Sequence, residues 1–148
     1  MTNIKLEEFK KYINGKKAAV IGVGISNTPL IRWLVSLGCK VTACDKMTDE
    51  DPVLKKNIEA LADCSDGIEW SLGESYLTHL RDDFYDIVFK TPKMRFETPE
   101  LAALGEKGSI LTTEMELFMN LCPAEIFGIT GSDGKTTTST LTAEILKQ

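Results

Sequence analysis

The sequence predicts an α/β fold in which a mostly parallel sheet carries helices on both faces. Short apolar runs alternate with amphipathic stretches along the 148 residues, and this alternation is typical of strands connected by helices. Glycines follow two of the apolar runs closely, where a strand would turn into a helix. The chain is 43% hydrophobic and 26% charged, so it can form a soluble domain with a buried core.

The first three elements form a strand–helix–strand unit. Residues 18–22 are an apolar run of strand length, residues 28–37 carry apolar side chains at helical spacing, and residues 40–45 form a second strand. A polar loop with Pro52 leads into a helix at about 53–62. Two strands joined through a helix in this way lie parallel in one sheet.

The same alternation continues toward the end of the chain. Pro99 stands at the first position of a helix, and Gly105 and Gly108 stand at its end. Pro123 marks a boundary before a strand at 125–130, which leads into a last helix. The other predicted elements are a strand at 67–71, a short helix at 74–80, a strand at 86–90, the helix at 99–106, a strand at 109–111 and a helix at 114–121.

Composition and charge exclude several classes of function. A net charge of −5 and an isoelectric point near 5.0 give no basic surface, so nucleic acid is not expected as a partner. The N-terminal residues lack the apolar stretch of a signal peptide, and no run is long enough to span a bilayer. We therefore expect a cytoplasmic protein without membrane insertion. The cysteines and His79 lack the spacing of metal ligands, so we expect reduced thiols and a histidine without a metal.

A glycine-rich turn follows the first strand. Gly22-Val-Gly24-Ile-Ser26-Asn27 matches a dinucleotide-binding fingerprint at two glycines, with Asn27 in place of the third. Asp45, at the end of the second strand, stands about where such sites place the acid that binds a ribose. Backbone N–H groups at the start of a helix favour a diphosphate, and Ser26 either adds a hydroxyl or caps the helix. The alternative is a tight turn that binds no ligand.

A second phosphate-binding turn lies near the C-terminal end of the sequence. Gly131-Ser-Asp-Gly134-Lys135-Thr136 follows an apolar run. In such loops backbone N–H groups and a lysine bind phosphates, and a hydroxyl helps to hold Mg²⁺. The longer usual pattern begins with a further glycine, but Ile129 occupies that position here. The loop is therefore a shortened form.

Two such turns in one chain imply two nucleotides, which an oxidoreductase would not need. The combination resembles the bacterial Mur ligases, and folylpolyglutamate synthases share the shortened loop. The resemblance covers essentially the whole chain but only the N-terminal third of the usual length in that family. Four stretches carry it: the turn at 22–26, the strand end at 86–92, the helix at 114–118 and the loop at 128–138.

The resemblance implies a Rossmann-like domain at 1–122, which binds the UDP of a muramoyl substrate, and the start of a truncated ATP-binding domain at 123–148. It implies a ligase that uses ATP and Mg²⁺ to join D-glutamate to UDP-N-acetylmuramoyl-L-alanine through an acyl phosphate in peptidoglycan synthesis. The implied substrate-binding residues are Gly24, Ile25, Ser26, Asp45, Lys46, Thr91 and Pro92. The implied ATP-binding residues are Gly131, Ser132, Asp133, Gly134, Lys135, Thr136 and Thr137, with Lys135 and Thr136 as catalytic residues and Thr136 also as a Mg²⁺ ligand.

The chain departs from the family pattern at three places. Lys93 follows Thr91-Pro92 where a glycine is usual, so it either adds a cation for the diphosphate or lies exposed on the loop. Glu114 follows Thr113 where Gly-Asp is usual, and an acid at a helix start is stabilising in itself, so neither Glu114 nor Glu116 is assigned a catalytic role. Asp133 stands where Asn is more common.

Two alternatives remain open at this point. One is a ligase of the same family that adds L-alanine to the muramate, although its longer glycine-rich turn is absent here. The other is a non-enzymatic regulatory module that binds NAD through Asp45. The rest of the ATP site and the amino-acid-binding domain of the family would lie beyond Gln148. We therefore expect this chain alone to be an inactive fragment and a monomer.

Overall fold

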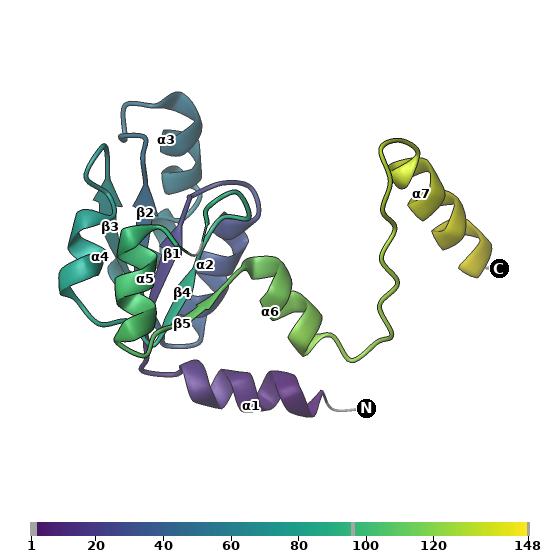
Figure 1. The fold of residues 1–148 in the computed structure, drawn as a ribbon, viewed down its shortest axis with the longest axis horizontal. Coiled ribbons are helices and arrows are strands. Elements are labelled where there is room, and N and C mark those ends of the chain that lie inside the picture. Colours follow the sequence, from purple (N-terminus) through teal and green to yellow (C-terminus); the bar gives the residue numbers. More distant parts are fainter. Residues whose placement is uncertain (1–2, 96, 148) are drawn as a thin grey trace.

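Five parallel strands form one sheet in the computed structural model, which describes residues 3–95 and 97–147 (Figure 1). The strands lie in the order β3-β2-β1-β4-β5. Because the chain passes from β3 on one side of β1 to β4 on the other, the carboxyl ends of β1 and β4 meet at a topological switch point. The predicted α/β fold with a parallel sheet is confirmed. The strands are β1 (Lys17–Ile21), β2 (Lys40–Asp45), β3 (Ile68–Leu72), β4 (Ile87–Phe89) and β5 (Ile110–Thr112).

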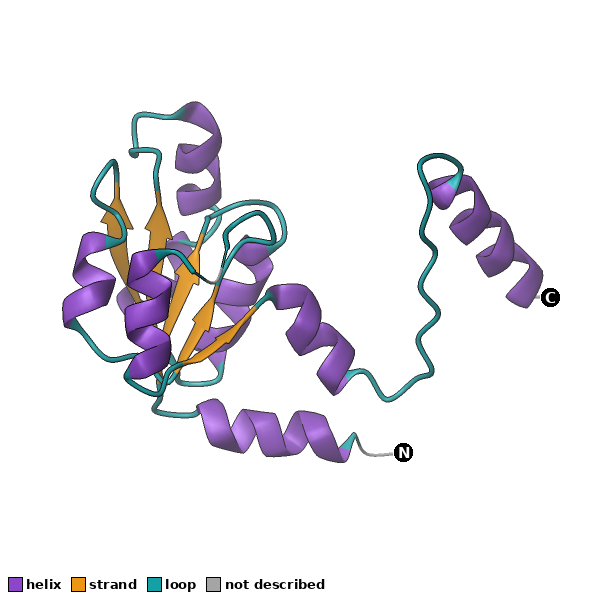
Figure 2. Cartoon of the chain, viewed as in Figure 1, coloured by secondary structure: helices purple, strands orange, loops and turns teal. Residues whose placement is uncertain are grey.

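Helices cover both faces of this sheet (Figure 2). Buried side chains of α1, α2 and α6 pack on one face, and buried side chains of α4 and α5 pack on the other. Among the described residues, no helix combines the length and the apolar character needed to cross a bilayer. The helices are α1 (Ile4–Ile13), α2 (Asn27–Ser36), α3 (Pro52–Glu59), the short 3₁₀ helix η1 (Ala62–Gly67), α4 (Thr78–Asp82), α5 (Pro99–Glu106), α6 (Glu114–Leu121) and α7 (Lys135–Leu146).

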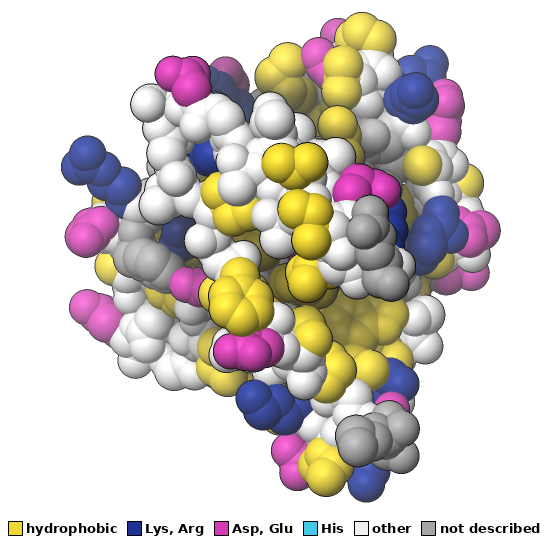
Figure 3. All heavy atoms as spheres, turned by 90° about the vertical axis from the view of Figure 1, so that its right-hand side faces the viewer, with side chains coloured by type: hydrophobic (Ala, Val, Ile, Leu, Met, Phe, Trp, Pro, Cys, Tyr) yellow, Lys and Arg dark blue, Asp and Glu magenta, His cyan; other side chains and the backbone are white. Residues whose placement is uncertain are grey.

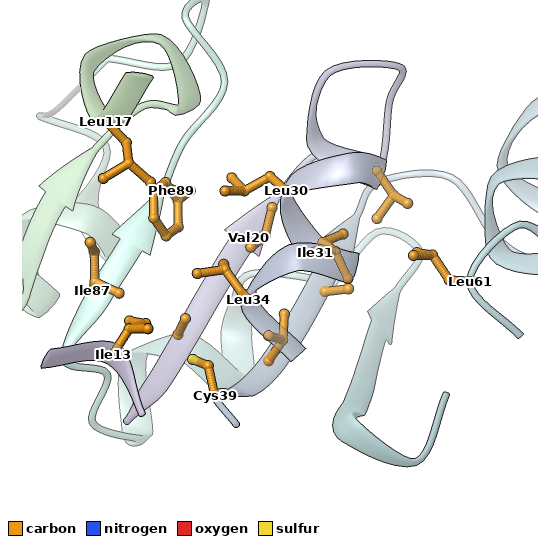
Figure 4. Close-up of a cluster of buried hydrophobic side chains, with 14 of the residues drawn as sticks. Ile13, Val20, Leu30, Ile31, Leu34, Cys39, Leu61, Ile87, Phe89 and Leu117 are labelled. Atoms are coloured by element: carbon orange, nitrogen blue, oxygen red, sulfur yellow. The ribbon is translucent and has the colours of Figure 1, made fainter. Parts of the chain in front are cut away.

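The central strand β1 divides the core into two layers because successive side chains point to opposite faces. Ala18 and Val20 belong to the layer under α2, and Ala19 and Ile21 belong to the layer under α5. Figure 4 shows the first layer, where Leu30, Ile31 and Leu34 of α2 pack over Val20. A strand that is apolar on both faces reads as one continuous apolar run, which is why the sequence indicates β1 so clearly.

The first helix, α1, was not predicted. Its sequence is rich in charge, and only Ile13 is fully buried. Asn3 caps the helix by accepting a hydrogen bond from Leu6 N–H, and its Nδ2 donates to Leu121 O at 2.6 Å. Phe9 stacks on Trp33 of α2 with ring centroids 5.6 Å apart. The helix therefore depends on tertiary contacts that a local pattern does not indicate.

The prediction of a strand at 125–130 is wrong for this structure. A strand is stabilised by backbone hydrogen bonds to a neighbouring strand, and within the described part of the chain this segment makes none. Its apolar side chains are exposed, Phe127 at 79%. The last helix forms as predicted, but every described residue from 123 onward is exposed. Figure 3, which faces this side of the molecule, shows hydrophobic and charged side chains at the surface together.

Other boundaries differ by a few residues. The helix predicted at 74–80 begins only at Thr78, and the helix predicted at 53–62 gives way to η1 after Glu59. The predicted domains 1–122 and 123–148 begin and end with residues that lie outside the described ones.

The exposure of residues 123–147 predicts that they contribute little to the stability of the sheet. A chain cut after Pro123 should melt within about 1 °C of the full chain, because burial of apolar surface supplies most of the stability. Thermal unfolding followed by circular dichroism measures this. Removal of residues 1–13 is the control, and it should lower the melting temperature because it removes Ile13. A drop of several degrees on removal of 124–148 would contradict the prediction.

Candidate functional site

A cleft of about 540 Å³ lies at the carboxyl edge of the sheet, where β1, β2 and β4 end. Its walls are the turn after β1, the loop between β2 and α3, the residues that follow β4, and the start of α6. In open parallel sheets this edge, at the switch point, is where ligands bind. The structure thus brings together segments that lie far apart in the sequence.

The turn after β1 requires glycine at position 22. Gly22 has a φ of +88°, in the left-handed region that side chains disfavour. A Cβ on Gly22 would lie 2.6 Å from Cγ2 of Thr91, the residue after Lys90 at the end of β4. Gly24 differs, since it has a negative φ and nothing within 4 Å of the position of a Cβ. Gly22 therefore allows close packing of the turn on Thr91, and Gly24 leaves open space in the cleft.

Asp45 joins the turn to the loop after β2. Its Oδ2 accepts a hydrogen bond from Val23 N–H at 2.8 Å, and its Oδ1 accepts one from Met47 N–H at 3.0 Å. The sequence predicts that this carboxylate binds a ribose or a base. In the structure Asp45 does line the cleft, and both of its oxygens already hold backbone groups in place.

Two asparagines hold the carbonyl groups of the same turn. Asn27 is buried, and its Nδ2 donates to Gly22 O at 2.8 Å and to Ile21 O at 3.2 Å. This residue stands at the third position of the glycine fingerprint, where a glycine would allow the helix to pack closely on the strand. Here the Asn27 side chain instead connects the helix to the turn by hydrogen bonds. Asn57 of α3 donates from Nδ2 to Val23 O at 2.8 Å. Sequence reasoning did not identify Asn57, because no local motif marks it.

The N-terminus of α2 presents backbone donors to the cleft. Within the part of the chain that the structure describes, the N–H groups of residues 24–27 have no hydrogen-bond acceptor. Ser26 is the N-cap, and its side chain makes no capping bond. Unpaired N–H groups at the positive end of a helix dipole attract anions. Gly24, Ile25 and Ser26 are therefore brought together as the sequence predicts.

The charged side chains around the cleft differ in their contacts and in their exposure to solvent. The Oδ1 atom of Asp51 caps α3 by accepting from Val53 N–H and Leu54 N–H. Glu114 lies in the first turn of α6, where the helix dipole favours a negative charge. Lys90 is the cation that lines the cleft among the described residues, and it is only 6% exposed. Sequence reasoning missed Lys90, although its place at the end of β4 is a signal that could have identified it.

The remaining residues predicted to bind substrate fall into two groups. Thr91 and Pro92 line the cleft beside the glycine turn. Lys46 does not, because its side chain is exposed and lies 3.8 Å from Glu74 Oε1. Lys93 is exposed and also lies outside the cleft lining.

Helix α6 begins with a capping box that accounts for one of the acids. Thr113 Oγ1 accepts from Glu116 N–H at 3.1 Å, and Glu116 Oε2 accepts from Thr113 N–H at 2.9 Å. Such reciprocal bonds satisfy two donors at a helix start. Glu116 is therefore a structural residue, and Glu114 remains beside the cleft.

The second turn that the sequence predicts to bind phosphate lies outside this cleft. Gly134, with a φ of +76°, precedes α7 as its N-cap, and Lys135 Nζ donates back to Gly131 O at 2.6 Å and to Ser132 O at 3.0 Å. All residues from Gly131 to Thr137 are exposed. The lysine, the hydroxyl of Thr136 and the helix start fit part of a nucleotide–Mg²⁺ site. The structure does not place them against the residues that line the cleft.

None of the cysteines belongs to the described residues that line the cleft. All four are free, and burial raises the pKa of Cys39 to about 11 and that of Cys44 to about 12. A thiol that remains protonated at neutral pH is a poor nucleophile and a poor metal ligand. Within the ranges 3–95 and 97–147, no three His, Cys, Asp or Glu side chains come together as a metal site.

Nearly the whole chain is similar to UDP-N-acetylmuramoylalanine–D-glutamate ligases. It is 51% identical over 146 residues, 99% of its length, to the ligase of Acetivibrio thermocellus. It is also 51% identical over 142 residues, 95% of its length, to that of Clostridium botulinum. The chain spans about 30% of the length of these relatives, close to the third implied by the sequence. The resemblance to Mur ligases is thereby confirmed.

The likeness to solved structures concerns the fold. The A chain of dipicolinate synthase from Bacillus subtilis matches 98% of this chain and 54% of its own length, with a TM-score of 0.50 and 17% identity. At this identity the match supports the Rossmann-like arrangement alone. A scan against models of protein families found no match.

The two glycines of the turn should respond differently to alanine. Gly22→Ala should lower stability by at least about 1–2 kcal/mol, the cost of a left-handed backbone for a residue with a Cβ, and the contact with Thr91 adds to it. Gly24→Ala, the matched control, should leave the melting temperature nearly unchanged. Chemical denaturation of both variants measures the free energies of unfolding. Equal losses of stability would contradict this account of the turn.

Proposed function

We propose that this chain is the UDP-substrate-binding part of an ATP-dependent ligase of peptidoglycan precursor synthesis. The whole enzyme would join D-glutamate to UDP-N-acetylmuramoyl-L-alanine. The observation that carries the proposal is the 51% identity to ligases of that name along nearly the whole chain. The cleft with free N–H groups at the start of α2 supports it independently. A cytoplasmic location and a monomeric state are part of the proposal.

The diphosphate of the substrate would bind at the glycine turn. Gly24, Ile25 and Ser26 would donate their backbone N–H groups to phosphate oxygens, and the N-terminus of α2 would stabilise the negative charge. Thr91 and Pro92 would form the adjoining wall of the cleft. This arrangement uses backbone donors for a charged group that any UDP-sugar shares.

The nucleoside would lie toward the end of β2. Each oxygen of Asp45 accepts one backbone N–H and keeps a second lone pair, so the carboxylate can still accept a hydrogen bond from the ribose or the uracil. Lys46 would contribute only by leaving Glu74, because its ammonium group now lies beside that acid.

The exposed C-terminal segment would belong to a separate ATP-binding domain that begins at residue 123. Lys135 would bind the phosphates of ATP after releasing the carbonyl groups of Gly131 and Ser132. Thr136 would hold Mg²⁺, with Thr137 beside it, and the backbone at 131–134 would enclose the phosphates. Bound ATP would supply the phosphoryl group that activates the substrate carboxylate as an acyl phosphate, which the amine of D-glutamate attacks.

The first test is the choice of nucleotide. We expect the chain to bind UDP and UDP-N-acetylmuramoyl-L-alanine, but not NAD, because the proposed site binds uridine at the edge formed by Asp45 and assigns no residue to adenosine or nicotinamide. Isothermal titration calorimetry with each ligand measures this. Binding of NAD without any response to UDP would favour a dinucleotide-binding regulatory module and overturn the proposal.

The second test concerns catalysis. The chain alone should show no ATPase or ligase activity, because phosphoryl transfer needs metal ions and several charged groups held together, and this loop is exposed on every side. A coupled assay for ADP release in the presence of UDP-N-acetylmuramoyl-L-alanine and D-glutamate checks this. Lys135→Ala serves as the control. Substrate-dependent turnover that is lost in Lys135→Ala would show that the segment is already a complete site.

A further inference from the structure

Two successive peptide groups of the glycine turn are held by side chains from three different elements. In the peptide between Gly22 and Val23, the carbonyl accepts from Asn27 and the N–H donates to Asp45, each at 2.8 Å. In the next peptide, the Val23 carbonyl accepts from Asn57 of α3 at 2.8 Å. The N–H at the other end of that second peptide belongs to Gly24, and it has no acceptor among the described residues.

The planarity of the peptide bond connects Asn57 to that free N–H group. No cis peptide bond is found among the described residues, and in a trans peptide the C=O and N–H groups point in opposite directions. A hydrogen bond that fixes the Val23 carbonyl therefore also fixes the direction of Gly24 N–H. Gly24 itself is exposed, lines the cleft and has open space around it. Its own carbonyl accepts from Thr28 N–H and Oγ1, but that carbonyl belongs to the following peptide group. Asn57 is the side chain that bonds to the peptide group carrying Gly24 N–H.

We propose that Asn57 is a positioning residue, which holds the Gly24 N–H group in the direction that a diphosphate requires. The inference rests on the proposed function, since the diphosphate of a UDP-sugar is the ligand concerned. Asn57 lines the cleft, and its amide acts on the diphosphate site through the Val23 carbonyl that it holds. Preorganised donors bind a charged group better than donors that must reorient on binding.

The experiment compares a ligand with phosphates and a ligand without them. The full chain is labelled with ¹⁵N and titrated with UDP and, separately, with uridine, and shifts of amide resonances give both dissociation constants. The variants are Asn57→Ala, which removes the donor, and Asn57→Gln, which keeps an amide donor. Lys56→Ala is the matched control, because Lys56 is exposed on the same helix. If Asn57→Ala does not fold, Asn57→Leu, which is similar in size and has no donor, takes its place.

We expect Asn57→Ala to raise the dissociation constant of UDP by about three- to tenfold, the range that one net hydrogen bond gives. Uridine binding should stay unchanged, and the melting temperature should fall by only a few degrees, because the Val23 carbonyl loses one donor. The Gly24 amide resonance of the unliganded chain should move in Asn57→Ala and return toward its original position in Asn57→Gln. Lys56→Ala should leave all of these values unchanged.

Two results would overturn the inference and leave the proposed function intact. One is wild-type affinity for UDP in folded Asn57→Ala. The other is an equal loss of affinity for UDP and uridine, which would mean that Asn57 supports the cleft as a whole. If the wild-type chain binds neither ligand, the proposed function fails, and the inference fails with it.

Discussion

The Asp45 carboxylate holds the carboxyl ends of β1 and β2 in one arrangement, and the geometry of the cleft depends on it. By accepting from Val23 and Met47, it joins the turn before α2 to the loop before α3. Asn27 and Asn57 then satisfy the carbonyl groups of the same turn. Hydrogen bonds to a charged acceptor are stronger than those between neutral groups, so Asp45 is the strongest of these links.

A second carboxylate has the same role at the opposite end of β1. Asp86, which precedes β4, accepts from Lys17 N–H and from Lys16 Nζ, each at 2.9 Å. Burial acts to raise the pKa of Asp86, but the hydrogen bonds from Lys17 and Lys16 outweigh it and the pKa is lowered. The central strand is thus tied to β2 at one end and to β4 at the other, each time through an acid that accepts backbone N–H groups.

The two glycine turns predicted to bind phosphate differ because only one of them is packed against the sheet. The turn after β1 contacts Asp45 of β2, Asn57 of α3 and Thr91, which follows β4. The residues around the turn before α7 are all exposed. Lys135 therefore bonds to carbonyl groups of its own loop. A phosphate loop gains its geometry from the strand before it and the helix after it, and here the preceding segment has no partner strand.

The sequence by itself determined the class of the fold, most of its elements and the positions of two glycine turns, each before a helix. These follow from local properties: the apolar period distinguishes strands from helices, and glycines mark turns that side chains would block. Gly24, Ser26, Asp45 and Thr91 could therefore be predicted as neighbours in one cleft. The resemblance to Mur ligases also follows from short motifs of this kind.

Only the tertiary structure decided which side chains meet across long separations in the chain. Asn57 lies 34 residues from the carbonyl that it holds, and Asn3 lies 118 residues from Leu121. The burial of Lys90, the exposure of Lys46 and the formation of α1 likewise depend on packing between distant elements. The apolar run at 125–130 is a case in which the local pattern predicts an element that the tertiary structure does not form. Its local pattern favours a strand, but a strand exists only where a neighbour accepts and donates its hydrogen bonds.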